Sequence, residues 1–108
     1  MAEISKLPEN LIGKEDQARL ESYGGHELAL GRATRFHWAR NEQGSPLFEI
    51  YRGGQEESLA VRIGRDRNRD EFWAEDPIGK LIVSGTLEHV MATLDKMLAR
   101  EHDRGEPA

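Results

Sequence analysis

Apolar residues in the C-terminal part of the chain recur at the spacing of an α-helix. From Leu87 onward they stand at intervals of three or four positions, which is the pattern of a helix with one buried face. The hydroxyl of Ser84 or Thr86 can accept a backbone N–H at the start of such a helix. The pattern predicts a helix from about Thr86 to Arg100, followed by a polar, disordered tail over residues 102–108.

Between about residues 28 and 84 the pattern changes to short runs of β-branched and aromatic residues separated by turn signals, which is typical of β-strands. We predict four or five strands, at residues 28–40, 47–52, 59–65, 71–75 and 80–84. Their connections are too short for a crossover helix, so neighbouring strands should pair antiparallel as a meander. Asp76, Pro77 and Gly79 suit a type I turn between the last two strands.

The first 27 residues have a less regular pattern. Residues 14–22 could form a short helix, but its apolar members are only Ala18 and Leu20, so the segment is either a short helix or partly disordered. With 108 residues, the chain is expected to hold one domain, residues 28–101, after the N-terminal segment 1–27. The predicted fold class is α+β: an antiparallel meander packed on one face by the C-terminal helix.

Alternation along the strands assigns side chains to two faces of the sheet. One face is apolar and should form the core; it holds Phe36, Trp38, Phe48, Ile50, Leu59, Val61, Ile63, Phe72, Leu81 and Val83. The other face mixes aromatic, apolar and basic side chains: Arg35, His37, Leu47, Tyr51, Arg62, Trp73, Lys80 and Ile82. If Leu47, Tyr51, Trp73 and Ile82 cluster there, they form an exposed apolar patch, which on a small domain usually marks a contact surface.

The candidate binding residues all come from this mixed face: Arg35, His37, Tyr51, Arg62, Trp73 and Lys80. Arginine and aromatic side chains are enriched in protein interfaces. The sequence therefore favours a non-catalytic interaction module that binds a protein partner or, as a homodimer, a second copy of itself. Coverage of the same residues by the N-terminal segment is the other structural explanation.

Single-stranded nucleic acid is the first alternative partner. Bases could stack on Tyr51 and Trp73, while Arg35, Arg62 and Lys80 neutralise phosphates. The formal net charge of −5 opposes this hypothesis, because binding to the phosphate backbone needs a concentrated positive surface. Since the acidic excess lies toward the two ends of the chain, the net charge weakens the hypothesis without excluding it.

A carrier of a small apolar ligand is the second alternative. It would need a cavity between the sheet and the helix. Met91 and Met97 lie among the inward-facing positions of the C-terminal helix, and flexible methionine side chains tend to fill such gaps. The sequence thus favours a filled core over a ligand cavity.

No catalytic constellation is evident. The paired carboxylates Glu56-Glu57 and Glu75-Asp76 are sequence neighbours, which point to opposite faces of a strand. The four histidines are at least eleven residues apart, too far for a local zinc motif, and His37 has no nameable catalytic partner. We therefore predict no enzyme activity, no metal and no cofactor.

Charge and composition narrow the remaining classes. Arginines alternate with polar residues over 65–70, but Asp66 and Asp70 can neutralise them, so a solvated turn is expected rather than an anion site. The absence of cysteine excludes a disulfide scaffold. The longest apolar runs have three residues, far fewer than the ~20 that span a bilayer. We predict a soluble, acidic, cytoplasmic protein without membrane contact.

Overall fold

The computed structural model describes residues 11–53 and 56–103 of the chain. The elements in these residues, in chain order, are α1 (Lys14–Ala29), β1 (Arg35–Arg40), β2 (Pro46–Arg52), β3 (Ser58–Asp66), β4 (Glu71–Glu75), β5 (Leu81–Gly85) and α2 (Leu87–Asp103). The predictions made for residues 1–10 and 104–108 lie outside the described residues.

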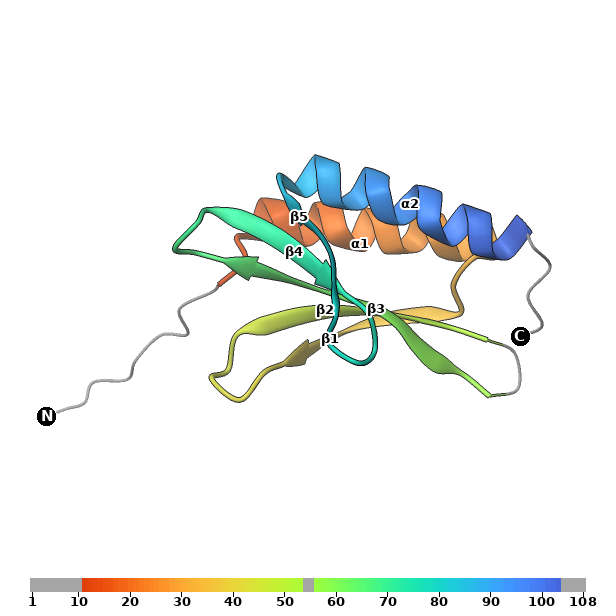
Figure 1. The fold of residues 1–108 in the computed structure, drawn as a ribbon, viewed down its shortest axis with the longest axis horizontal. Coiled ribbons are helices and arrows are strands. Elements are labelled where there is room, and N and C mark those ends of the chain that lie inside the picture. Colours follow the sequence, from red (N-terminus) through yellow and green to blue (C-terminus); the bar gives the residue numbers. More distant parts are fainter. Residues whose placement is uncertain (1–10, 54–55, 104–108) are drawn as a thin grey trace, which may run out of the picture.

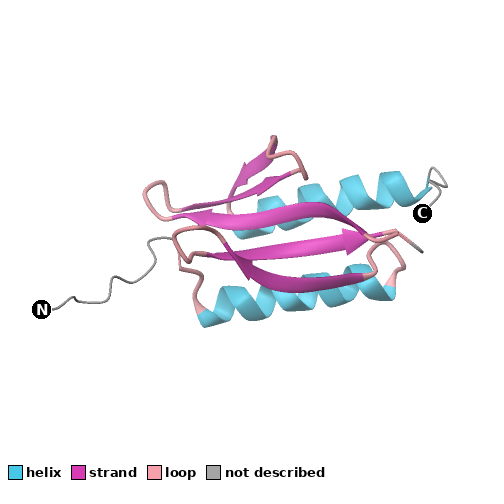
Figure 2. Ribbon diagram, turned by 90° about the horizontal axis from the view of Figure 1, so that it is seen from below, coloured by secondary structure: helices cyan, strands magenta, loops and turns pink. Residues whose placement is uncertain are grey.

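The strands form one antiparallel sheet in which each strand pairs with its neighbour in sequence, in the order β1-β2-β3-β4-β5 (Figure 2). In the turn between β4 and β5, the Asp76 carboxylate accepts the backbone N–H groups of Ile78 at 3.0 Å and Lys80 at 2.8 Å. The N–H of Gly79 donates to the Asp76 carbonyl. The predicted α+β class, the meander and the position of this turn are confirmed.

Both helices lie on the same face of the sheet, side by side (Figure 1). α1 packs against β1, whereas α2 packs against β4 and β5. Arg19 of α1 also forms an ion pair with Glu88 of α2. We call this side of the molecule the helix layer. The opposite side of the sheet, which no element of the described residues covers, is called the open face.

The N-terminal helix is longer than the sequence predicts, and the first strand is shorter. Leu28, the predicted start of that strand, belongs to α1 instead, and β1 begins at Arg35. Gly24 and Gly25 obscure the helix in the sequence, because glycine weakens helices. Gly24 is nonetheless required where it stands, since a Cβ at this position would lie 2.6 Å from the ring of Phe36.

The core lies between the helix layer and the sheet. Its fully buried members come from both helices and from β2, β3 and β4: Leu20, Phe48, Ile50, Val61, Ile63, Ala74, Val90, Leu94 and Leu98. The ring centroids of Phe36 and Trp38 lie 5.1 and 5.0 Å from that of Phe48. The central part of the predicted apolar face therefore forms the core.

Two bulges, one in β3 and one in β5, change the face of the sheet to which neighbouring side chains point. In β3 the extra residue is Ala60, and Leu59 consequently lies on the open face. In β5 the extra residue is Ile82, and Leu81 pairs with Glu75 on the open face. The assignment of Leu59 and Leu81 to the core was wrong for this reason, and Leu81 is 60% exposed.

α2 begins as the sequence predicts and ends later. Of the two predicted capping residues, Thr86 acts as the cap: its Oγ1 accepts the N–H of His89 at 3.1 Å, and its carbonyl accepts that of Val90. The helix continues to Asp103. Its last two residues thus belong to the helix rather than to the predicted disordered tail.

Candidate functional site

The open face brings together four of the six predicted binding residues. Strand register sets Arg35 opposite Tyr51, and His37 opposite Glu49. It also sets Glu49 opposite Arg62. Because paired residues of an antiparallel sheet point to the same side, these side chains surround Glu49, a residue that the sequence reasoning did not single out.

Glu49 is 7% exposed and accepts three side-chain hydrogen bonds. The donors are His37 Nε2 at 2.8 Å, the Tyr51 hydroxyl at 2.9 Å and Arg62 Nε at 2.9 Å. Burial alone would raise the pKa of the Glu49 carboxyl, but these hydrogen bonds outweigh burial and lower the pKa below its usual value. The open face therefore contains an ionised carboxylate that is well supplied with donors.

Arg35 covers the ring of Tyr51. Its guanidinium carbon lies 4.0 Å from the ring centroid, and its Nε donates to Glu57 at 2.6 Å. The hydroxyl of Thr34 donates to the other oxygen of Glu57 at 2.7 Å. The hydrogen bonds from Thr34 and Arg35 lower the pKa of the Glu57 carboxyl. One face of the Tyr51 ring is thus occupied within the protein itself.

Trp73 belongs to β4, where it pairs with Gly64 and Ser84, and Lys80 precedes β5, so neither residue is a strand partner of Glu49. The Trp73 indole lies over Gly64, where a Cβ would approach its ring to 2.3 Å. Gly64 is therefore the residue that lets the indole lie against the sheet. Lys80 precedes β5 in the hairpin, and its side chain is exposed.

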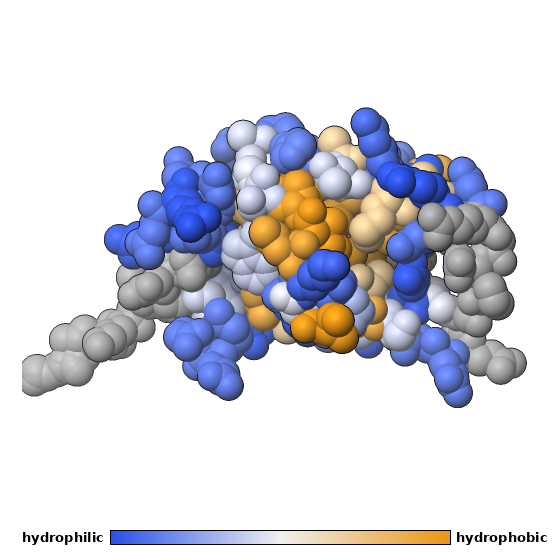
Figure 3. Space-filling view, in the orientation of Figure 1, coloured by the Kyte–Doolittle hydropathy of each residue, from blue (hydrophilic) through white to orange (hydrophobic). Residues whose placement is uncertain are grey.

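The exposed apolar surface lies at the β4–β5 hairpin rather than at the centre of the open face. Leu47, predicted to be part of an exposed patch, is buried at 9% exposure, whereas Ile78 is 87% and Leu81 60% exposed. Figure 3 shows hydrophobic side chains gathered over β5. We define the β5 patch as Trp73, Ile78 and Leu81.

A second cluster of ionisable side chains lies in the helix layer, around Glu27. This side chain has 0% exposure, and its Oε1 lies 3.4 Å from Arg32 Nη1. The same Arg32 nitrogen lies 2.8 Å from Asp95, whose carboxylate is 3.9 Å from His26 Nε2. Among the described residues, the buried Glu27 Oε2 and the Tyr23 hydroxyl have no hydrogen-bond partner.

The surroundings of this cluster shift the pKa values of Glu27, Tyr23 and Asp95. Burial, reinforced by the neighbouring Asp95, raises the pKa of the Glu27 carboxyl to about 7. Burial also raises the pKa of the Tyr23 hydroxyl. The interaction with Glu27 lowers the pKa of Asp95, with Arg32 acting in the same direction. Near neutral pH the cluster therefore contains one ionised carboxylate and one that is close to half protonated.

An open groove of about 420 Å³ adjoins the cluster in the helix layer. Its lining residues are Arg19, Ser22, Tyr23, His26 and Met91. Two of them, Tyr23 and His26, also belong to the surroundings of Glu27. The groove thus gives solvent a route to the edge of the cluster.

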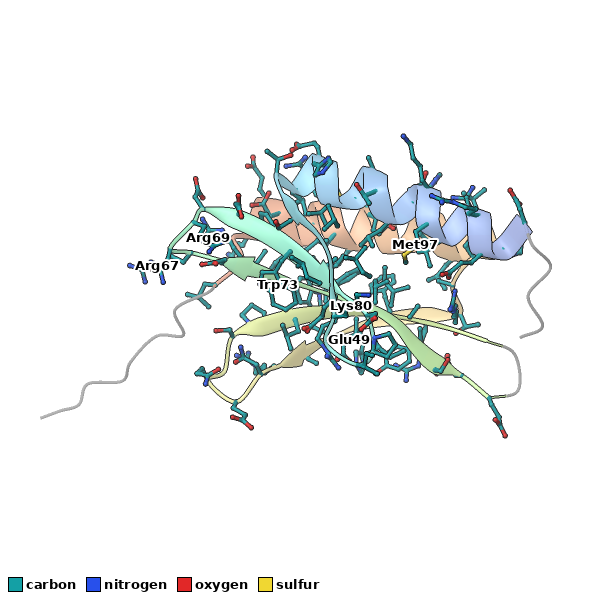
Figure 4. The ribbon with its side chains drawn as sticks, in the orientation of Figure 1. Glu49, Arg67, Arg69, Trp73, Lys80 and Met97 are labelled. Atoms are coloured by element: carbon teal, nitrogen blue, oxygen red, sulfur yellow. The ribbon has the colours of Figure 1, made fainter. Side chains whose placement is uncertain are left out.

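The arginine-rich hairpin between β3 and β4 has the internal pairing that its sequence suggests. Arg65 lies 2.7 Å from Asp70, and Arg69 lies 3.9 Å from Asp66. Asp66 also accepts the backbone N–H of Asn68 at 3.0 Å. Arg67 and Arg69 stand at the tip of this hairpin (Figure 4). These contacts fit a solvated turn better than an anion site.

Comparisons with other proteins assign no family. Neither the profiles of known families, nor the curated proteins, nor the solved structures gave a match to this chain. No helix in the described part of the chain is long and apolar enough to cross a membrane. Inference about function therefore rests on the open face and the helix layer themselves.

Proposed function

We propose that the protein is a non-catalytic interaction module that binds a second copy of itself through the open face, at the β5 patch. The observation that carries this proposal is the exposure of Ile78, at 87%, and of Leu81, at 60%. They accompany the half-buried Trp73 of the adjacent strand. Exposed apolar side chains gathered in one region of a small domain mark contact surfaces, and covering them contributes roughly 25 cal/mol per Å² of apolar area.

The charges of the open face favour a second copy over a strongly charged partner. Positive and negative groups alternate across the strands, as in the pairs Arg35 with Glu57 and Arg62 with Glu75. A two-fold interface requires a surface that complements itself. A mixture of both signs meets this requirement, whereas a face of one sign would repel its own copy.

The two edges of the sheet support the same choice of partner. β1 begins with Arg35 and ends with Arg40, and charged side chains on an edge strand discourage pairing with another chain. β5, with the sequence LIVSG, carries no charge. The β5 edge therefore presents no charged side chain to a second copy that docks on the β5 patch beside it.

The Glu49 network supports a structural role rather than catalysis. A general base acts best when its pKa lies near the working pH, and the hydrogen bonds to Glu49 lower the pKa of its carboxyl instead. His37, the other candidate base, is engaged with Glu49 through Nε2 and lies 3.2 Å from Arg35 through Nδ1. These contacts hold the side chains of the open face in place.

Nucleic-acid binding has no specific observation in its favour. Arg35 and Arg62 each pair with carboxylates, and Arg35 lies over the Tyr51 ring on which a base would stack. A fluorescence titration with a labelled single strand at low salt tests this alternative. Binding that falls with salt and is lost in Arg62→Ala or Trp73→Ala would replace the present proposal.

The apolar-ligand alternative is likewise less supported. Phe48, Ile50 and Leu94 are fully buried between sheet and helices, so these positions fit a filled core. The open groove of the helix layer has Arg19, Ser22 and His26 among its lining residues, which suits a polar molecule better than an apolar one. Stoichiometric binding of an apolar dye by the native protein would favour a carrier.

Light scattering across a dilution series that reaches about 100 µM tests the self-association. The wild type is expected to approach twice the chain mass of 12.2 kDa, and Leu81→Asp to remain a monomer, because its charge would be buried unpaired in the interface. Leu30→Asp is the matched control: Leu30 is 44% exposed but lies at the end of α1, and this variant should dimerise as the wild type does.

Two results would contradict the proposal. One is a wild type that stays monomeric throughout the series. The other is an equal effect of Leu81→Asp and Leu30→Asp on the measured mass. Because both leucines are exposed, neither change should unfold the monomer, and thermal melts of the variants check that condition.

A further inference from the structure

We propose that the helix layer contains a binding site for a divalent transition-metal ion, formed by His26, Glu27 and Asp95. One ligand atom from each side chain can be chosen so that all lie within 4.8 Å of one another. His26 and Glu27 belong to α1, and Asp95 belongs to α2. An ion held by these three ligands would therefore connect the two helices.

The buried Glu27 carboxylate supplies an independent observation that points to a ligand. Its side chain is fully buried, and its Oε2 has no hydrogen-bond partner among the described residues. The contact of Arg32 with Oε1 is long, at 3.4 Å. Buried polar atoms are normally satisfied by protein, ordered water or an ion. When Glu27 is ionised, this oxygen has lone pairs for a cation, which would replace the proton of the hydrogen bond between Glu27 and Asp95.

The charges around Glu27 leave room for a cation. Glu27 and Asp95 face a single guanidinium, that of Arg32, so the ionised cluster has an excess of one negative charge. Arg32 opposes a metal ion by its own charge. It can remain beside the ion, however, because a carboxylate such as Asp95 has lone pairs for a metal and for a hydrogen-bond donor at the same time.

The donor types indicate which ions fit. An imidazole nitrogen with two carboxylate oxygens suits Zn²⁺ and neighbouring transition metals, whereas Mg²⁺ and Ca²⁺ prefer oxygen donors alone. The side chain of His26 is 58% exposed and lines the groove described above. The groove thus provides an access route, and three protein ligands leave a fourth tetrahedral position for solvent.

The sequence predicts no metal site because its histidines are far apart along the chain. His26 and Glu27 are sequence neighbours, but Asp95 comes from the other helix. Only the packing of α1 beside α2 brings the three together. The test of this inference is independent of the proposed self-association, because none of its ligands lies on the open face.

The experiment is a calorimetric titration of ZnCl₂ into the full-length protein after treatment with EDTA, with thermal melts recorded in parallel. We expect one ion per chain and a higher melting temperature with zinc. His26→Ala should weaken binding by at least about tenfold, the loss that follows removal of even an outer-shell partner. MgCl₂ should give no comparable heat.

His102→Ala is the matched control, since His102 is an exposed histidine near the end of α2. Zinc binding that is lost in His26→Ala and in Glu27→Gln but kept in His102→Ala supports the site. No binding by the wild type, or an equal loss in His102→Ala, overturns it. His26 is largely exposed, so its replacement should leave the zinc-free melt unchanged.

Discussion

The open face and the helix layer each bury a glutamate, and the two carboxylates have opposite surroundings. Glu49 is 7% exposed and accepts hydrogen bonds from three side chains, which lower the pKa of its carboxyl. Glu27 is 0% exposed and has one long contact with a donor, Arg32; burial, reinforced by Asp95, raises its pKa to about 7. The two carboxyl groups are similarly buried, yet their pKa values shift in opposite directions. The difference arises because Glu49 accepts several good hydrogen bonds and Glu27 does not.

This difference separates the roles of the two regions. On the open face, the carboxylate, the histidine and the arginines satisfy one another, which leaves the β5 patch as the part that offers contact energy to a partner. In the helix layer, one oxygen of the Glu27 carboxylate has no hydrogen-bond donor among the described residues, and a solvent-accessible groove lies beside the cluster. We therefore assign protein contact to the first region and ion binding to the second, as proposals.

The largest expected effect is on the pH dependence of stability. Between pH 4.5, the ordinary value for the carboxyl, and about pH 7, the folded protein keeps a proton on Glu27 that the unfolded chain has released. The free energy of unfolding contributed by this group therefore falls as pH rises through that window, by on the order of 3 kcal/mol. Urea denaturation at a series of pH values in the presence of EDTA measures the fall.

The matched variants for this prediction are Glu27→Gln and Glu49→Gln. The first should remove the fall between pH 4.5 and about 7, because the amide does not titrate. The second should retain it, since the Glu49 pKa is lowered and its contribution is lost only as pH falls below that window. A Glu27→Gln profile parallel to that of the wild type would show that the two glutamates do not differ as described.

The next effect is the loss of stability in Glu49→Gln at pH 7. The amide keeps the shape of the side chain but lacks the negative charge with which His37 and Arg62 interact. Hydrogen bonds to charged groups contribute about 1.5–3 kcal/mol, so a loss of about 2 kcal/mol is expected by chemical denaturation. At the same pH, Glu27→Gln should cost less. A larger loss of stability in Glu27→Gln than in Glu49→Gln would contradict the proposed difference between the two glutamates.

The smallest effects concern two glycines that each make room for an aromatic ring. Gly24→Ala places a Cβ 2.6 Å from Phe36 in the packed helix layer, and Gly64→Ala places one 2.3 Å from Trp73 on the open face. Overpacking a core costs roughly 1–3 kcal/mol, partly offset by the higher helix propensity of alanine. We expect Gly24→Ala to lose about 1 kcal/mol in thermal or urea unfolding.

Gly64→Ala should cost less than Gly24→Ala, because the half-buried indole can tilt toward solvent. Its clearer signature is a red-shifted emission of Trp73, recorded in a Trp38→Phe background, in which Trp73 is the remaining tryptophan. Gly25→Ala, where a Cβ meets nothing within 4 Å, is the control for helix propensity. A loss of stability in Gly25→Ala as large as in Gly24→Ala would argue against steric contact with Phe36.

Much of the fold could be predicted because local signals and the tertiary structure agree. The apolar spacing of α2, the apolar and aromatic residues of β2 and the turn at Asp76 each report directly on the element that forms. α1 could not be predicted in full, because Gly24 and Gly25 lower helix propensity and only the contact with Phe36 explains the first of them. The bulges at Ala60 and Ile82 arise from strand register, which alternation alone does not specify.

The two glutamates were missed for different reasons. Glu49 has the same parity as Tyr51 along β2, so its side of the sheet was readable from the sequence. The burial of Glu49 could not be predicted from the sequence, because it depends on pairing with His37 and Arg62, which belong to two other strands. Glu27 lies in the part of α1 beyond the predicted helix, and its partner Asp95 belongs to the other helix.

The contrast between the two carboxylates can be measured most directly by carbon-detected NMR of the glutamate side chains across a pH titration in EDTA. We predict a midpoint near pH 7 for Glu27 and one below 4.5 for Glu49. Coincident midpoints near 4.5, or a midpoint for Glu27 below that of Glu49, would contradict this prediction.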